Sequence, residues 1–208
     1  MDRIIQFSVP RSGSTLITQI LMEMFPDTEV QKVHGYREDW YLYPVVVAVR
    51  DFRDCLVSIW RTHQNIPLDK VESSKMIKEE IDLWLGKLLK NIDDLDRITD
   101  ECSPLILKYE DFVDSHELIF SKIENFFRID FPGETLVKIA AKTSIENNLK
   151  KSLELNRFEQ YDHDNLIHGL HIYKKGRPGA WLSLIPKEHH SFVNKKLEKS
   201  LKKWGYKI

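Results

Sequence analysis

The stretch IIQFSVPRSGSTL, residues 4–16, decides the fold, because it passes from an apolar run through a polar loop into a helical pattern. The apolar run at residues 4–9 predicts a buried strand. Gly13 allows the backbone to come close to a ligand, whereas a generic turn would use Ser12 or Ser14 only to cap the helix that follows. One face of that helix carries Leu16, Ile17, Ile20, Leu21 and Met24. The stretch therefore predicts a strand-loop-helix unit.

The rest of the chain repeats this alternation. Residues 45–49 and 105–107 are apolar runs that also predict buried strands. Two further helical stripes consist of Ile77, Ile81, Trp84, Leu88 and Leu95, and of Leu118, Ile119, Ile123, Phe126 and Phe127. Strands that alternate with helices predict a three-layer α/β fold with a central, mainly parallel β-sheet flanked by helices. Ligands of such sheets bind at the carboxyl ends of the strands.

Length and composition predict a single globular domain over residues 1–208. The 208 residues are 42% hydrophobic and 30% charged, which excludes the disordered, collagen-like and disulfide-framework classes. The 31 Lys and Arg residues nearly balance the 32 Asp and Glu residues, so the net charge of −1 predicts no nucleic-acid partner. No set of His, Cys and carboxylate residues has the spacing of metal ligands, so no metal is expected.

The sequence also predicts a cytoplasmic protein with no membrane partner. The longest apolar run, residues 41–49, is far shorter than the roughly 18 residues of a membrane helix and contains Pro44. Gln6, Pro10 and Arg11 interrupt what would have to be the apolar segment of a signal peptide. Only two cysteines are present, which favours a reducing compartment.

Residues 10–16, with the sequence PRSGSTL, have the features of an anion site. Free backbone N–H groups and the positive end of the helix dipole face a ligand there, and Arg11 adds a charged donor. The ATP-binding pattern GxxxxGK[ST] is not matched, because no lysine follows the glycine. A generic turn between a strand and a helix would produce the same pattern.

A second candidate anion site follows the strand at residues 45–49. Arg50 lies at the end of this strand, and Ser58 follows eight residues later, inside the next helix. An arginine fork and a hydroxyl suit a phosphate. Pairing of Arg50 with Asp51 or Asp54 for structural reasons alone is the alternative.

Together these two runs resemble motifs of the sulfotransferases that use 3′-phosphoadenosine 5′-phosphosulfate (PAPS). Residues 10–16 resemble the family's 5′-phosphosulfate loop, and Arg50 with Ser58 resembles its 3′-phosphate motif. Residues 108–112, KYEDF, resemble the segment whose tyrosine, here Tyr109, lies beside the adenine. Residues 174–181, KKGRPGAW, match the loop that closes over the 3′-phosphate, although Lys174 and Ala180 stand where the family usually has Arg and Asp.

The resemblance implies a P-loop NTPase-like sulfotransferase core that binds PAPS, releases the product PAP and needs no metal. A further short segment, residues 143–145, resembles one that lines the adenine pocket of the family. The residues that the resemblance assigns to the nucleotide are Arg11, Ser12, Gly13, Ser14, Thr15, Leu16, Arg50, Ser58, Tyr109, Thr143, Ser144, Ile145, Lys174, Lys175 and Gly176.

The segment Lys32-Val33-His34 resembles the family's Lys-x-His segment, in which the histidine removes the proton of the acceptor. Histidine suits this role, because its ordinary pKa of about 6.5 leaves the base form populated at neutral pH. Lys32 would neutralise sulfuryl oxygens, and Glu38 or Asp39 is a candidate to orient the imidazole. The resemblance thus implies a catalytic set of His34, Lys32, Arg11 and Ser58.

Several alternatives stay open on the sequence alone. The base could be Glu29 or Glu38, because relatives that sulfate tyrosine use a glutamate. The protein could be a P-loop-like nucleotide or small-molecule kinase, or a non-catalytic adenine-nucleotide-binding protein. The acceptor is a small molecule, a carbohydrate or a tyrosine-type group, and the oligomeric state is undetermined. Aromatic candidates for an acceptor pocket are Trp40, Tyr41, Tyr43, Trp60 and His63.

Overall fold

The computed structural model describes residues 1–113, 115–173 and 176–208, and it confirms the α/β architecture. A sheet of four parallel strands has the order β2-β1-β3-β4. The strands are β1 (Arg3–Ser8), β2 (Glu29–Val33), β3 (Val45–Val49) and β4 (Leu105–Lys108). All three strands predicted from apolar runs are therefore present.

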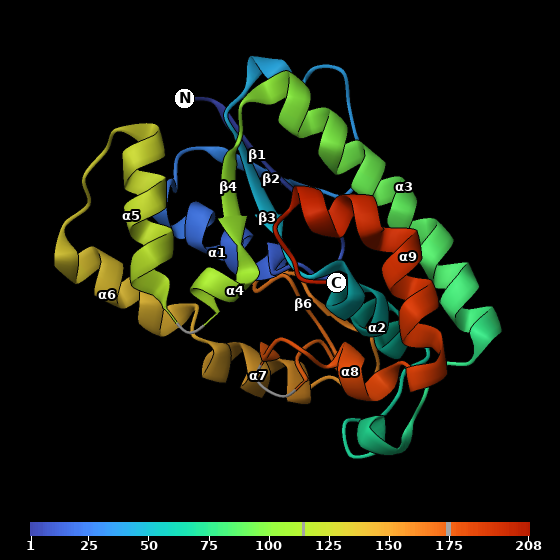
Figure 1. Cartoon of the computed structure of the whole chain (residues 1–208). Helices are drawn as coiled ribbons and strands as arrows, with labels where there is room; N and C mark the ends of the chain where they lie inside the picture. Colours follow the sequence, from blue (N-terminus) through green and yellow to red (C-terminus); the bar gives the residue numbers. More distant parts are fainter. Residues whose placement is uncertain (114, 174–175) are drawn as a thin grey trace.

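Helices cover both faces of the sheet (Figure 1). Successive strand residues point to opposite faces, so Ile4 packs on one side and Ile5 on the other. One face is covered by α1 (Ser14–Met24), α4 (Tyr109–Phe112), α5 (His116–Phe127) and α6 (Gly133–Lys142). The other face is covered by α2 (Phe52–His63), α3 (Lys78–Cys102) and α9 (Lys187–Lys203). The central strand β3 is buried on both faces along its whole length.

The edge strand β2 is the element that the apolar pattern did not predict. Three of the five residues in its sequence EVQKV are polar, and none of the five is fully buried. It forms because it pairs in parallel with β1, with Gln6 opposite Lys32 and Phe7 opposite Val33. This pairing brings Lys32 and His34 to the same edge of the sheet as the loop that follows β1.

Neither Ser12 nor Ser14 caps α1. The residue before the helix is Gly13, which has a φ of 96° and makes no side-chain capping bond. A Cβ atom at this position would lie 2.8 Å from Cδ2 of Tyr109. Glycine is therefore required by the left-handed backbone and by the close approach of the tyrosine ring.

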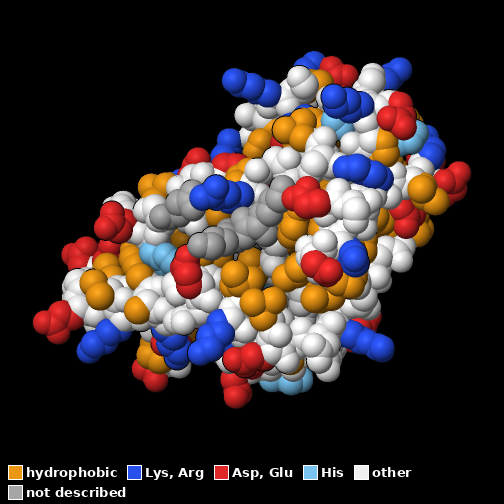
Figure 2. Space-filling view, turned by 90° about the horizontal axis from the view of Figure 1, so that it is seen from below, with side chains coloured by type: hydrophobic (Ala, Val, Ile, Leu, Met, Phe, Trp, Pro, Cys, Tyr) orange, Lys and Arg blue, Asp and Glu red, His pale blue; other side chains and the backbone are white. Residues whose placement is uncertain are grey.

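The chain from α7 (Ile145–Leu153) to α8 (Trp181–Leu184) runs across the carboxyl edge of the sheet (Figure 1). It includes the short hairpin of β5 (Tyr161–Asp162) and β6 (Ile167–His168). The short 3-10 helices η1 (Trp40–Leu42) and η2 (Val71–Ser73) lie in connections. Figure 2 views the molecule from this side, where basic, acidic and apolar side chains are intermixed.

Among the described residues, no helix combines the length and the apolar character needed to cross a membrane. The single-domain organisation and the cytoplasmic location stay predictions.

Candidate functional site

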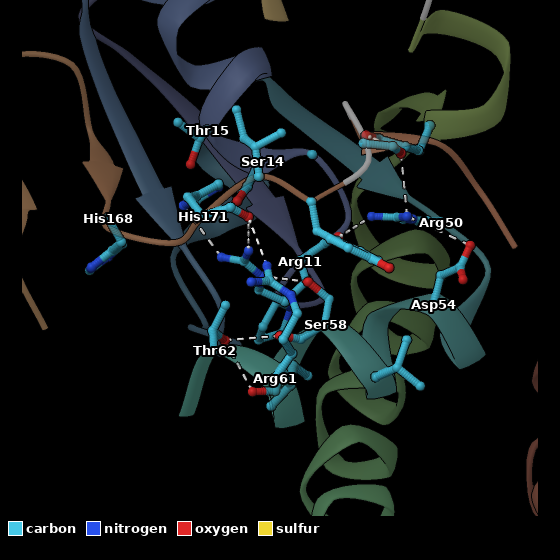
Figure 3. Close-up of a pocket in the computed structure, with 18 of the residues that line it drawn as sticks. Arg11, Ser14, Thr15, Arg50, Asp54, Ser58, Arg61, Thr62, His168 and His171 are labelled. Carbon is cyan, nitrogen blue, oxygen red and sulfur yellow. Dashed lines mark hydrogen bonds and ion pairs between the residues drawn. The ribbon is translucent and has the colours of Figure 1, made fainter. Parts of the chain in front are cut away.

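A cavity of about 440 Å³ opens at the carboxyl edge of the sheet and collects most of the predicted site residues (Figure 3). Its volume is in the range of small-molecule and nucleotide sites. Ser12 and Ser144 do not line it, and Lys174 and Lys175 lie outside the described residues. The predicted residues that line it are Arg11, Gly13, Ser14, Thr15, Leu16, Lys32, His34, Arg50, Ser58, Tyr109, Thr143, Ile145 and Gly176.

The loop after β1 is shaped by the buried side chain of Ser12. Its hydroxyl lies 2.7 Å from the carbonyl oxygen of Val9 and 2.9 Å from that of Ala48, and its N–H donates to Val9. Ser12 therefore anchors the loop to the sheet, and its N–H is already used. The N–H groups of Ser14, Thr15 and Leu16 have no partner within the helix and lie at the cavity wall. They form the anion-binding end of α1.

Arg11 extends into the cavity from this loop as a partly buried cation. Its Nε donates to Ser58 Oγ at 3.0 Å, and its Nη2 donates to the carbonyl oxygen of His171 at 2.5 Å. Burial, Arg61 and Arg50 lower the pKa of Arg11 to about 9, so it keeps its proton at neutral pH. Among the described residues no carboxylate pairs with Arg11, and an anion in the cavity would offset its charge.

Lys32 stands beside the start of α1. Its Nζ donates to Thr15 Oγ1 at 2.9 Å. Burial and the charge of Arg11 lower the pKa of Lys32 to about 8. This amine is thus charged at neutral pH and lies next to the N–H groups of the loop.

His34 has the tautomer that a general base requires. Its Nδ1 lies 2.8 Å from the carbonyl oxygen of Ser8, which can only accept, so Nδ1 carries the hydrogen and Nε2 holds a lone pair. Burial lowers the pKa of His34, Lys32 and Arg11 add to the effect, and the bond to Ser8 opposes it. The imidazole at the cavity wall is therefore neutral at pH 7.

The expectation that Glu38 or Asp39 orients His34 is wrong, because the carbonyl of Ser8 does so. Asp39 pairs instead with Arg37 at 3.3 Å. The alternative base Glu29 lies at the opposite end of β2, where it pairs with Arg3 at 2.8 Å. Neither Glu29 nor Glu38 lines the cavity.

Arg50 lies at the other end of the cavity and retains a free donor. Its guanidinium lies 4.3 Å from the centre of the Tyr109 ring, and its Nη2 is 3.6 Å from Asp54 Oδ2 and 3.4 Å from the carbonyl oxygen of Gly176. Its Nε is buried and has no partner among the described residues. Asp51 forms its ion pair with Arg53, at 2.6 Å, and not with Arg50. Arg50 is thus only loosely paired with Asp54 and can accept an anion.

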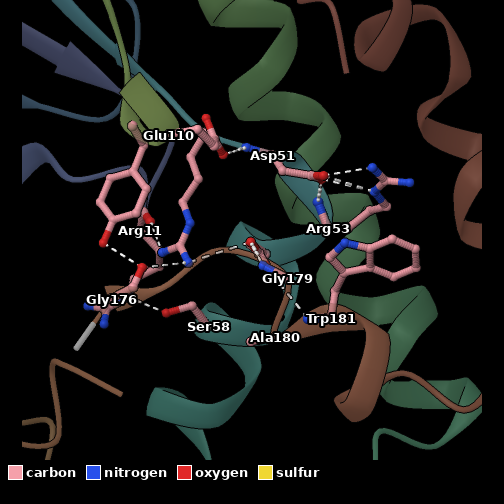
Figure 4. Close-up of polar contacts among 12 residues, drawn as sticks. Arg11, Asp51, Arg53, Ser58, Glu110, Gly176, Gly179, Ala180 and Trp181 are labelled. Carbon is pink, nitrogen blue, oxygen red and sulfur yellow. Dashed lines mark hydrogen bonds and ion pairs between the residues drawn. The ribbon is translucent and has the colours of Figure 1, made fainter. Parts of the chain in front are cut away.

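Gly176 lines this end of the cavity (Figure 4). Tyr109 Oη donates to the carbonyl oxygen of Gly176 at 2.7 Å. Gly176 has a φ of 76°, and a Cβ atom there would lie 2.2 Å from Tyr109 Oη. Only glycine fits at this position.

Thr143 and Ile145 line the cavity near Tyr109 and Val113. Thr143 is buried and donates its hydroxyl to the carbonyl oxygen of Ile139 at 2.8 Å. Ser144 caps α7 by accepting the N–H of Asn147 at 3.3 Å. This wall can pack against a flat ring.

The family model of the sulfotransferase domain matches residues 42–205. The chain belongs to the sulfotransferase family. Its fold is similar to that of mouse sulfotransferase SULT7A1 in complex with PAP, at 14% identity and a TM-score of 0.70, over 97% of this chain and 85% of that one. It is also similar to that of retinol dehydratase in complex with androsterone and the inactive cofactor PAP, at 13% identity and a TM-score of 0.67, over 96% and 80% of the two chains. A comparison with curated protein sequences gives no match.

The cavity of this sulfotransferase has an aromatic wall that differs from the predicted one. Trp40 and Trp60 are core residues, Tyr43 packs against the core, and Tyr41 is 69% exposed. Of the five aromatic candidates only His63 lines the cavity. It stacks on Trp84, with ring centres 4.6 Å apart, and lies 5.6 Å from the ring of Phe158.

Sequence reasoning missed Trp84 because it belongs to an apolar stripe of α3, and it missed Phe158 and His171 because residues 149–172 match no motif. Arg61 of α2 was also missed. It is buried and donates to the carbonyl oxygens of Leu170 at 2.7 Å and His171 at 3.2 Å. Arg61 thereby fastens the chain segment that crosses the edge of the sheet. No group of three or more His, Cys, Asp or Glu side chains suited to a metal occurs within the described ranges.

Proposed function

We propose that this sulfotransferase moves a sulfuryl group from PAPS to the hydroxyl of a small aromatic acceptor, with His34 as the general base. The observation that carries the proposal is the meeting of His34, Lys32, Arg11, Ser58 and Arg50 in one cavity. Arg11, Lys32, His34 and Arg50 come from the ends of three strands, and Ser58 comes from α2. The cavity is basic where two anionic groups of a nucleotide would bind.

The described residues fit the nucleotide. Arg11 and the N–H groups at the start of α1 suit the 5′-phosphosulfate, and Arg50, with its buried unpartnered Nε, suits the 3′-phosphate. Tyr109, Thr143 and Ile145 form the wall for the adenine. Lys174 and Lys175 stay predictions from the sequence.

PAPS, when bound, supplies the sulfuryl group and a leaving phosphate. Nε2 of His34 is placed to take the proton of the acceptor hydroxyl, since Nδ1 is engaged with Ser8. Lys32 and Arg11 hold positive charge where sulfuryl and phosphate oxygens would lie, and preorganised charge of this kind stabilises a transition state. Ser58 keeps the Arg11 guanidinium in place through its bond to Nε.

The acceptor is proposed to be aromatic because of the wall formed by His63, Trp84 and Phe158. Stacked or edge-to-face rings recognise a flat ring without specific hydrogen bonds. A carbohydrate or a tyrosine-type acceptor would be an alternative occupant, and a panel of phenols, sugars and tyrosine peptides with sulfur-labelled PAPS separates them.

Nucleotide binding tests the proposal first. PAP should raise the melting temperature of the protein, whereas AMP and ATP with Mg²⁺ should raise it much less, because Arg50 recognises a 3′-phosphate. At a hundredfold excess over the dissociation constant the stabilisation is about 2.7 kcal/mol. Equal shifts from PAP and AMP would contradict the assignment of Arg50, and a larger shift from ATP with Mg²⁺ would favour the kinase alternative. Binding of PAP without any turnover would favour the non-catalytic one.

The pH dependence of kcat/KM follows from the shifted pKa values of His34 and Lys32. The pKa of His34 is lowered, so the acid limb should lie below pH 6.5. The pKa of Lys32 is lowered to about 8, so activity should fall as the pH rises through about 8 and the ammonium loses its proton. An aromatic alcohol of the benzyl type serves as the acceptor in this measurement, because its hydroxyl does not titrate in this pH range.

Lys32→Arg is the matched variant for the alkaline limb. Arginine stays protonated, so the limb should move to higher pH in this variant. An alkaline limb at the same pH in both proteins would show that Lys32 is not the group that titrates.

A further inference from the structure

The proposed function leaves the carboxylate of Asp54 without a role. Asp54 lines the cavity, where it is the one acidic side chain among the described lining residues. Its side chain is 0% exposed. A carboxylate in a basic cavity repels a bound anion. Asp54, labelled in Figure 3, must therefore contribute to the site in another way.

The carboxylate of Asp54 accepts hydrogen bonds from the backbone of residues 176–181, of which Gly179 and Trp181 are labelled in Figure 4. Its Oδ2 accepts the N–H of Gly179 at 2.7 Å, and its Oδ1 accepts the N–H of Trp181 at 3.1 Å. The other end of this loop, at Gly176, is held by Tyr109 and Arg50. One carboxylate therefore fixes the far end of residues 176–181.

The same carboxylate also contacts the arginine at the 3′-phosphate end of the cavity. Nη2 of Arg50 lies 3.6 Å from Asp54 Oδ2, one helical turn away in sequence. Burial raises the pKa of Asp54, whereas Arg50 and the two backbone N–H groups lower it. Asp54 links the loop backbone and the Arg50 guanidinium into one unit.

The neighbouring residues reinforce this link. The guanidinium of Arg53 lies 4.1 Å from the centre of the Trp181 ring and donates to Asp51. The ring of Trp181 thus packs on α2, and the backbone N–H of Trp181 donates to Asp54 of the same helix. Loss of Asp54 would leave the N–H groups of Gly179 and Trp181 without an acceptor.

We infer that Asp54 is a positioning residue for recognition of the 3′-phosphate: it fixes the backbone at Gly179 and Trp181 against Arg50, so that the loop and the arginine face the phosphate together. This inference rests on the proposed function. It predicts that removal of a negative charge from an anion site weakens the binding of the anion, which is the opposite of the purely electrostatic expectation.

Asp54→Asn tests the inference, because the side chain keeps its shape and loses one acceptor and the charge. The amide oxygen can accept one of the two N–H groups, and the amide nitrogen faces the other with a donor. The dissociation constant of PAP should rise about tenfold, and that of AMP should stay within about twofold, as measured by calorimetry. Hydrogen exchange at Gly179 and Trp181 should become faster in the variant.

Asp96→Asn is the matched control. Asp96 also carries a paired carboxylate, 2.9 Å from Lys203, but it does not line the cavity. Its loss should leave the preference for PAP over AMP unchanged. Asp54→Glu keeps the charge and displaces the two acceptor atoms by one methylene, so it should also weaken PAP selectively. This second variant keeps the test decisive if Asp54→Asn does not fold.

Two results would overturn the inference alone: an unchanged preference for PAP over AMP in both Asp54 variants, or tighter binding of PAP by Asp54→Asn. A wild-type protein that binds AMP as tightly as PAP would instead overturn the proposed function, and the inference with it. The wild-type measurement therefore separates the two failures.

Discussion

Replacing His34 with Ala is expected to lower turnover by roughly 100- to 10,000-fold, the usual contribution of a positioned general base. Its Nε2 is the free acceptor at the cavity wall, since Nδ1 donates to Ser8. Binding of PAP should change little, because His34 is assigned to the acceptor and not to the nucleotide. Single-turnover kinetics with labelled PAPS, together with PAP binding by calorimetry, measure the two quantities separately.

Two further variants make this result specific. His34→Gln can still donate to the Ser8 carbonyl but has no basic nitrogen, so it should be as inactive as His34→Ala. His189→Ala removes a histidine that does not line the cavity and should leave turnover unchanged. Normal turnover in His34→Gln would show that the proton is taken by another group.

Replacing Arg11 with Ala is expected to lower turnover at least 1,000-fold. Arginines that stabilise the transition-state charge in phosphoryl transfer contribute to the rate on this scale. Arg11 is a partly buried cation in the loop after β1, and it donates to Ser58 Oγ and to the carbonyl oxygen of His171. Its loss also removes a charge from a cavity that needs one to hold the phosphosulfate, so PAP should bind more weakly as well.

The stability of the protein without nucleotide separates this role from a structural one. Burial and the charges of Arg61 and Arg50 lower the pKa of Arg11, which means that its charge is unfavourable in the empty fold. Arg11→Ala should therefore change the melting temperature little without nucleotide, and it should abolish most of the shift that PAP produces.

Arg11→Lys and Arg3→Ala are the matched variants. The lysine keeps a positive charge but loses the fork that reaches Ser58 and His171 together, so an intermediate activity is expected. Arg3 lies at the other end of β1 and pairs with Glu29 on the surface, so its loss should have no effect on turnover. Turnover of Arg11→Ala within tenfold of the wild type would contradict the role of this residue.

Local sequence signals predicted the part of the site that follows β1 and β3. An apolar run, a glycine and an arginine within a few residues are enough to indicate a strand end with an anion-binding loop, and the structure places Arg11, Arg50 and Ser58 in one cavity. The edge strand β2 gave no such signal, because three of its five residues are polar and none of the five is fully buried.

Because sequence signals are local, they also failed to identify the residue that caps α1 and the group that orients His34. A serine before a helix usually caps it, but here Gly13 occupies that position and Ser12 turns its hydroxyl toward the sheet. The sequence offers Glu38 and Asp39 as partners of His34, whereas in the structure its partner is the carbonyl oxygen of Ser8 on the neighbouring strand. Backbone acceptors cannot be recognised in a sequence, because every residue carries one.

The sequence by itself determined the parallel α/β order and the polar residues at the strand ends, because the hydrophobic period and the spacing of Arg50 and Ser58 are properties of short segments. Tertiary structure alone decided which polar groups are free and which are bound. The hydrogen bond between Arg11 and His171 joins residues 160 positions apart in the sequence, and that between Asp54 and Gly179 joins residues 125 positions apart. The aromatic wall of Trp84 and Phe158 likewise depends on how α3 and the segment after α7 pack. Contacts between residues so far apart follow from the packing of the whole core, and no local pattern encodes them.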